Sequence, residues 1–244
     1  MLKDRIEGKW IDAFGKVFEL SNVKAGDPIA ILSETQSREI NVHLCELALL
    51  RLGAKPFHVV LPTPAQTVGV PVRSTGASTA IQGLRPVVSA LKEATMVADC
   101  TVEGTMHARE TPEILKAGSR ILYISNDHPE LLERLVPDAA LKAKVQKGIG
   151  RLRKAKEMRV TSEAGTDLRV NVAGAPSGGG WGFCADPGKL DHWPGGIVVC
   201  FPNAGSVNGT LVMDRGDINL TFKRYLESPV TLAVGNDYVI DIAG

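Results

Sequence analysis

The sequence is poor in cysteine and histidine, and neither residue forms a metal-binding pattern. The four cysteines stand apart without a Cys-x-x-Cys pair, and the five histidines include no His-Glu-x-x-His motif. Cysteine zinc sites of the common spacings are therefore excluded, and the chain's own ligand spacings show no complete metal site. Cys45 and Cys200 lie in apolar patterns, which indicates buried, reduced thiols.

Long apolar runs and an excess of one charge are also missing. No run approaches the roughly 18 apolar residues that a transmembrane helix needs. The N-terminal stretch MLKDRIEGKWIDAF lacks the apolar centre of a signal peptide, so we expect a cytoplasmic protein with no membrane partner. The 28 basic and 27 acidic residues leave a net charge of +1, which argues against a nucleic-acid partner held by overall charge.

What remains is ordinary globular composition with an alternating first half. The 244 residues, 44% hydrophobic, suffice for one large or two modest domains. Helices are expected at 39–52 and 77–94, the second kinked or broken at Pro86. Apolar strands are expected before, between and after these helices, at 27–32, 55–61, 95–102 and 120–124. This alternation predicts an α/β domain, residues 1–137, with a parallel sheet covered on both faces.

The second half changes character after Pro137. Residues 138–157 are predicted to form a basic linker helix, weakened in its middle by Gly148 and Gly150. Period-two segments then predict a mostly antiparallel, β-rich, catalytic-type domain over 158–244. Its strands are expected at 158–161, 168–172, 196–201, 209–213, 218–222, 230–234 and 238–242. The last strand ends at Gly244 with nothing to close the sheet, so we expect either a homo-oligomer that covers this edge or a domain truncated at its C-terminus.

Three predicted loops carry candidate site residues. His107 follows a strand of the parallel sheet, where ligands bind in open α/β folds, and imidazole is suited to acid/base work. Trp181 lies in a glycine-rich loop, and His192 and Trp193 belong to Asp-His-Trp-Pro before a strand, a set that could bind a polar aromatic ring. Each has a structural alternative: a capping or surface histidine, an indole packed on its own domain, and a buried turn network.

Three longer stretches resemble a known family. MHARETPEILKAGSRIL (106–122), CADPGKLDHWPGGIVVCFPN (184–203) and NGTLVMDRGDINLTFKRY (208–225) are similar to the 2,5-dihydroxypyridine 5,6-dioxygenases of nicotinate and nicotine degradation. That family is itself similar to the aminopeptidase T and S group, whose members are often labelled leucyl aminopeptidases.

The resemblance implies a non-haem Fe(II) dioxygenase that acts on a small aromatic or heteroaromatic substrate with O2. The ring would open between carbons 5 and 6 to give N-formylmaleamate. His107 falls on the family's acid/base histidine, and Trp181, His192 and Trp193 fall on pocket positions. The family's iron ligands lie C-terminal to the position of Gly244, so this chain is expected to supply no metal ligand.

Two alternatives remain open from the sequence. A metallo-aminopeptidase would need the metal-binding glutamate of its family within 201–209, where Asn203 and Ala204 stand instead. Loss of that carboxylate removes a ligand from a two-metal site and disfavours the peptidase. The second alternative is a catalytically incomplete binding fragment.

Overall fold

The protein is described here by a computed structural model that covers residues 5–65, 76–220 and 222–244. These residues divide into two compact units. The first contains the described residues up to Lys142 together with Gly180–Gly196, and the second contains Ala143–Gly179 and Ile197–Gly244. The division departs from the predicted one because a segment of the second half returns to the first unit.

The first unit is built on a five-stranded parallel sheet with the order β2-β1-β3-β4-β8. Its strands are β1 (Pro28–Glu34), β2 (Lys55–Leu61), β3 (Met96–Asp99), β4 (Arg120–Ile124) and β8 (Leu190–Trp193). Every residue of β3 and β4 is buried, as expected for mostly apolar strands in a sheet covered on both faces. The predicted parallel α/β fold is confirmed.

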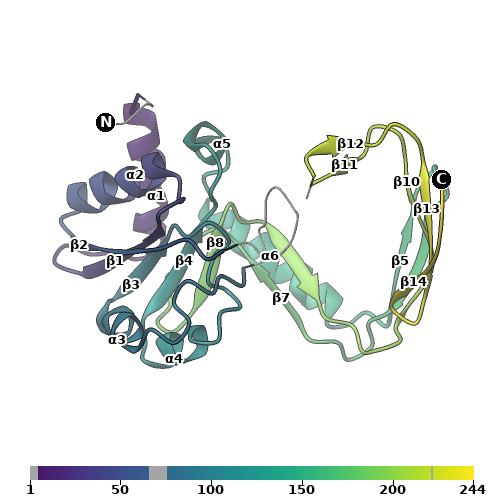
Figure 1. Cartoon of the computed structure of the whole chain (residues 1–244). Helices are drawn as coiled ribbons and strands as arrows, with labels where there is room; N and C mark the ends of the chain where they lie inside the picture. Colours follow the sequence, from purple (N-terminus) through teal and green to yellow (C-terminus); the bar gives the residue numbers. More distant parts are fainter. Residues whose placement is uncertain (1–4, 66–75, 221) are drawn as a thin grey trace. The chain divides into compact units, whose positions relative to one another are not determined.

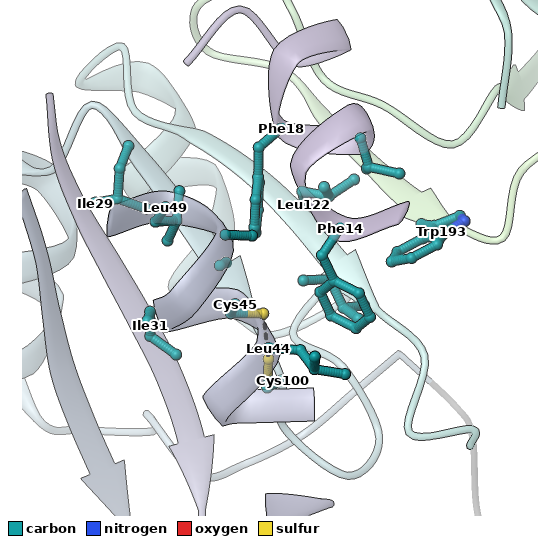
Figure 2. Close-up of a cluster of buried hydrophobic side chains, with 14 of the residues drawn as sticks. Phe14, Phe18, Ile29, Ile31, Leu44, Cys45, Leu49, Cys100, Leu122 and Trp193 are labelled. Carbon is teal, nitrogen blue, oxygen red and sulfur yellow. Dashed lines mark hydrogen bonds between the residues drawn. The ribbon is translucent and has the colours of Figure 1, made fainter. Parts of the chain in front are cut away.

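Helices cover both faces of this sheet (Figure 1). One face carries α1 (Gly8–Leu20), α2 (Glu39–Arg51) and α5 (Pro129–Arg134), and the other carries α3 (Arg85–Glu93) and α4 (Thr111–Lys116). Each face has its own apolar core. Figure 2 shows the core under α1 and α2, where Phe14, Leu44 and Trp193 gather. The core under α3 and α4 includes Leu32, Leu91 and Ile121.

Two elements of the first unit differ from their predicted form. The helix expected at 77–94 begins only at Arg85, because Pro86 occupies its first turn, where no backbone N–H donor is needed. Pro86 therefore starts a helix instead of kinking one. The strand expected at 95–102 ends at Asp99. The Asp99 carboxylate accepts backbone N–H groups of Thr101 and Thr105, so the residues after it form a loop.

The strand β8 corrects a further expectation. Leu190–Trp193 is not a loop before a strand of the β-rich domain; it pairs in parallel with β4, with His192 opposite Tyr123. Two hydrophobic side chains make this pairing favourable, since Trp193 enters one core of the sheet and Leu190 packs against the other.

The second unit is mostly antiparallel, as predicted. Its main sheet has the order β14-β13-β10-β6-β5, and β7 pairs separately with β9. The bounds are α6 (Ala139–Leu152), β5 (Glu157–Thr161), β6 (Asp167–Asn171), β7 (Ser177–Gly180), β9 (Ile197–Cys200), β10 (Val207–Met213), β11 (Ile218–Asn219), β12 (Arg224–Tyr225), β13 (Val230–Gly235) and β14 (Tyr238–Ala243). Within the strand predicted at 218–222, residue 221 lies outside the described residues. No helix in the described part of the chain is long and apolar enough to cross a membrane.

Candidate functional site

A crevice forms where the connections from two neighbouring strands leave the parallel sheet in opposite directions. β1 leads into α2 on one face, whereas β3 leads into α4 on the other. In open α/β sheets this switch point, at the carboxyl ends of the strands, is where ligands bind. A cavity of about 190 Å³ lies there, and its lining includes Glu34, Thr63, Ser78 and Glu103.

A row of side chains crosses the sheet beside this crevice. The strand register places Asp99 of β3 opposite Tyr123 of β4, and Tyr123 opposite His192 of β8. Leu32 of β1 continues the row and packs in the core under α3 and α4. Because side chains alternate between the two faces of a strand, register partners in parallel strands share a face. Asp99, Tyr123 and His192 therefore all lie on the α3–α4 side.

Asp99 organises the loop that follows β3. Its fully buried carboxylate accepts hydrogen bonds from the backbone N–H and the hydroxyl of Thr101, at 3.0 and 2.6 Å. The other oxygen accepts two more from the N–H and hydroxyl of Thr105, both at 2.7 Å. Burial raises the pKa of Asp99, and these hydrogen bonds act in the opposite direction. The carboxyl thus fixes residues 101–105 over the end of the strand.

Glu34 ends β1 and is the second buried carboxyl of the crevice. Its Oε1 accepts a hydrogen bond from the Ser78 hydroxyl at 2.8 Å, and its backbone N–H donates to Ser37 Oγ at 2.7 Å. Burial raises the pKa of Glu34, and the nearby Asp99 charge raises it further. Two acidic groups whose pKa values are raised by burial are typical of a functional cleft, although structural networks produce the same pattern.

His107 lies on the loop that Asp99 holds. Its side chain is exposed, and its backbone N–H donates to Gly76 O at 2.5 Å. It lines a second cavity of about 230 Å³ together with Ser78, Gln82 and Arg109. The two cavities share residues 77–79 in their lining. Position and exposure are compatible with the predicted acid/base role, which stays a prediction.

His192 and Trp181 are placed by the buried Asp191. This carboxylate accepts hydrogen bonds from the backbone N–H groups of His192, Trp181 and Gly182 at 2.7, 3.0 and 3.3 Å. Trp181 is half-buried, and Lys142 Nζ lies 4.9 Å from the centroid of its indole ring, within the range of a cation–π contact. Burial raises the pKa of Asp191 against these bonds. The substrate-binding roles of His192 and Trp181 stay predictions.

Trp193 differs from the other three candidates because it is entirely buried. Its ring meets Phe14 edge-to-face at a centroid distance of 4.9 Å, and its Nε1–H donates to Leu135 O at 2.8 Å (Figure 2). The side chain has no exposed ring face on which a substrate could stack. Trp193 therefore has the geometry of a structural residue of the core.

Glu34, Asp99 and Tyr123 were not among the sequence candidates. A signal for the first two exists, because each is an acidic residue at the end of an otherwise apolar strand. Their burial depends on Ser78, Thr101 and Thr105, which the strand pattern does not connect to them. Tyr123 looked like an ordinary strand residue, and only the register with Asp99 and His192 gives it a place in the site.

An iron site does not fit the described residues. They contain no group of three or more His, Cys, Asp or Glu side chains that could hold a metal ion. Asp99 and Asp191 are each occupied by hydrogen bonds from neighbouring N–H or hydroxyl groups.

An open parallel sheet with a polar crevice at its switch point, together with an antiparallel unit, defines a two-unit α/β protein. Residues 9–244 match the model of the NicX family, described as 2,5-dihydroxypyridine 5,6-dioxygenase. The chain belongs to this family.

Individual relatives agree with the family match. The 2,5-dihydroxypyridine 5,6-dioxygenase of Pseudomonas putida KT2440 is 33% identical over 233 residues, which are 95% of this chain. This chain spans 66% of that relative's length. The solved structure of 2,5-dihydroxypyridine dioxygenase from the same organism matches with a TM-score of 0.88 and 32% identity, covering 96% of this chain and 67% of that one.

A second solved structure, wild-type AmpT from Thermus thermophilus, shares the fold alone. It has a TM-score of 0.58 and 12% identity, and the match covers 96% of this chain and 70% of that one. The expected relation of the fold to the aminopeptidase group is thereby confirmed at the level of architecture.

Proposed function

We propose that the protein is a ring-opening dioxygenase that cleaves 2,5-dihydroxypyridine, or a closely similar hydroxylated ring, between carbons 5 and 6 with O2 to give N-formylmaleamate, as in nicotinate degradation. Family membership carries this proposal. It is supported by the cavity beside His107, whose polar lining of Thr79, Gln82 and Arg109 suits a small ring bearing hydroxyl groups.

We propose Fe(II) as the cofactor. Its ligands would come from a region that corresponds to the third of the relative's length that this chain does not match. Iron, when bound, would supply the activation of O2. The share of this chain is to place the ring and to handle the proton of a substrate hydroxyl, which His107 would accept and later return.

His107→Ala tests the residue role, and His43→Ala is its matched control. His43 lies on α2, on the opposite face of the parallel sheet. We expect His107→Ala to lower kcat by about 10²–10⁴-fold, the usual range for loss of an acid/base group, with iron content unchanged. His43→Ala should leave turnover intact. Wild-type turnover by His107→Ala would remove His107 from the chemistry.

The activity itself is measured as O2 consumption after anaerobic Fe(II) loading, with 2,5-dihydroxypyridine as substrate and mass spectrometry of the product. The intact mass of protein from its native source is determined first, because a mass above 26.0 kDa would show residues beyond this chain. Release of leucine from a peptide with zinc or cobalt, without O2 uptake, would favour the aminopeptidase instead. Binding of the ring without either reaction would favour a binding fragment.

A further inference from the structure

We propose that Ser78, anchored on the buried Glu34, is a positioning residue that holds His107 in place from the side of the crevice opposite to Asp99. This inference rests on the proposed role of His107. It assigns a task in the same site to a residue that lies far from His107 in the sequence and does not touch the reacting atoms.

The first step is the contact between Ser78 and the sheet. Ser78 is 5% exposed, and its hydroxyl donates to Glu34 Oε1 at 2.8 Å. The same hydroxyl oxygen accepts the backbone N–H of Ala80 at 3.2 Å. Both capacities of the buried hydroxyl are therefore used, and the segment that leads into α3 is fastened to the end of β1 at this point.

The second step leads from Ser78 to His107 through the backbone. The Ser78 N–H donates to Gly104 O at 2.9 Å, and the Gly76 N–H donates to Glu103 O at 2.9 Å. Gly76 O accepts the N–H of His107 at 2.5 Å. Residues 76–78 thus run alongside 103–107 and form one wall of the His107 loop.

Close packing couples this wall to the imidazole itself. Gly76 has a φ of +67°, and a Cβ atom at this position would lie 3.2 Å from Cδ2 of His107. A shift of residues 76–78 would therefore change the position of the His107 imidazole ring. On the other side, Asp99 fixes residues 101–105 through four hydrogen bonds. The loop is held between two carboxyls at the ends of neighbouring strands, and Ser78 connects the first of them to it.

Loss of the Ser78 hydroxyl should free one wall of the loop. Misplacement of a catalytic group by about 1 Å can cost up to about 10²-fold in rate, because the reacting atoms leave their productive geometry. We expect kcat to fall and KM to change little, since Ser78 acts through His107 and not through the bulk of substrate binding.

The test compares Ser78→Ala with Ser37→Ala. Both remove one serine hydroxyl that is hydrogen-bonded to Glu34, but Ser37 accepts the Glu34 N–H in the turn toward α2, away from the His107 loop. The first measurement is the NMR signal of the His107 imidazole in the intact chain, assigned with His107→Ala, which needs neither metal nor substrate. Ser78→Ala should shift or broaden this signal, and Ser37→Ala should leave it unchanged.

Two conservative variants and an assay complete the design. Ser78→Thr restores the hydroxyl and Glu34→Gln keeps an acceptor, so both should preserve the His107 signal even if Ser78→Ala folds poorly. In the active protein, Ser78→Ala should lower kcat by about 10–100-fold with KM within about twofold. An identical His107 signal in Ser78→Ala and Ser37→Ala would overturn the proposal. Full turnover of His107→Ala would overturn the proposed role of His107, while the NMR comparison would still decide whether Ser78 positions its ring.

Discussion

At the scale of single residues, Trp193 shows how a candidate for ring stacking becomes a core residue. An indole beside a histidine and an aspartate suggests a polar aromatic site, but alternation along β8 sends Trp193 and His192 to opposite faces of the sheet. Trp193 fills the core against Phe14, and its N–H is satisfied by Leu135 O. His192 alone is left on the side of the crevice.

We predict that the main effect of Trp193→Ala is on the stability of the fold and not on kcat or KM. Removal of a fully buried indole costs about 3–5 kcal/mol in the free energy of unfolding, and Leu135 O would also lose its donor. Urea unfolding followed by circular dichroism measures this loss. Trp181→Ala is the control: its ring is only half-buried, so its cost should be smaller. Unchanged stability of Trp193→Ala with a raised KM would return Trp193 to the substrate site.

Glu34 gives a prediction for pH dependence. Its pKa is raised above the ordinary 4.5 by burial and by Asp99, so folding favours the neutral form. The stability due to neutral Glu34 is complete below pH 4.5 and is lost as the pH rises through the raised pKa. Because the amide introduced by Glu34→Gln stays neutral at every pH, the free energy of unfolding of this variant minus that of wild type should increase with pH.

The control for this measurement is a glutamate with the opposite shift. Lys92, and more weakly Arg85, lower the pKa of Glu113, so ionised Glu113 stabilises the fold above its ordinary pKa. Glu113→Gln minus wild type should therefore decrease as the pH rises. Unfolding curves recorded between about pH 3 and about pH 8 extend below the ordinary pKa of 4.5, where Glu113 changes the stability, and above it, where Glu34 does. A flat difference for Glu34→Gln would contradict the raised pKa.

At the scale of elements, the packing of α6 explains Gly148, which the sequence presents only as a residue that weakens the helix. A Cβ on Gly148 would lie 2.8 Å from Cγ2 of Val198, whereas one on Gly150 would meet nothing within 4 Å. Gly148 permits close packing on β9. Gly150 allows no such contact and only lowers helix stability, because glycine loses more conformational entropy on folding than alanine does.

We predict opposite effects of alanine at these two positions of one helix. Gly150→Ala should raise the free energy of unfolding by about 0.5–1 kcal/mol, the difference in helix propensity between the two residues. Gly148→Ala should lower it, because the branched Val198 side chain has little room to move aside. Thermal melts of the two variants beside wild type test the pair, and stabilisation by both would contradict the observed packing.

The elements that the sequence predicted share a simple pattern, and those it did not predict depend on tertiary contacts. β1, β2 and β4 are short apolar runs bounded by turn residues, so they could be located from the sequence. The short β8 has a charged residue within it, and nothing local says that its partner is β4. The same holds for the site: His107 could be found from its place after a strand, but Ser78 acquires its partner only through folding.

At the scale of the whole molecule, the two edges of the antiparallel sheet differ in character. The edge strand β5 carries Glu157 and Arg159, charges of the kind that discourage pairing with another chain. The other edge strand, β14, exposes 75% of Tyr238, 70% of Ile240 and 67% of Ile242. A bulge in the pairing with β13 interrupts the alternation, since Tyr238 lies opposite Gly235 and Ile242 lies opposite Leu232. The exposed apolar side chains therefore fall on both faces of this edge strand.

We predict that the exposed edge strand β14 associates with a second copy, in keeping with the expected homo-oligomer. Light scattering of the purified chain should give a mass well above 26.0 kDa, and the double variant Ile240→Lys, Ile242→Lys should bring it down toward that value. Lys24→Ala, in a turn of the first unit, is a control that should leave the mass unchanged. A wild-type mass of 26.0 kDa would contradict association through β14.

The return of the chain to complete the parallel sheet has a consequence for biosynthesis. During translation β4 emerges early, but its neighbour β8 leaves the ribosome only after residues 143–179 of the second unit have been made. Until Trp193 arrives, Phe14 and Leu135 O lack their partner. During this interval the nascent first unit has one edge of its sheet unpaired, and an unpaired strand edge with uncovered apolar side chains is the kind of surface on which partly folded chains aggregate.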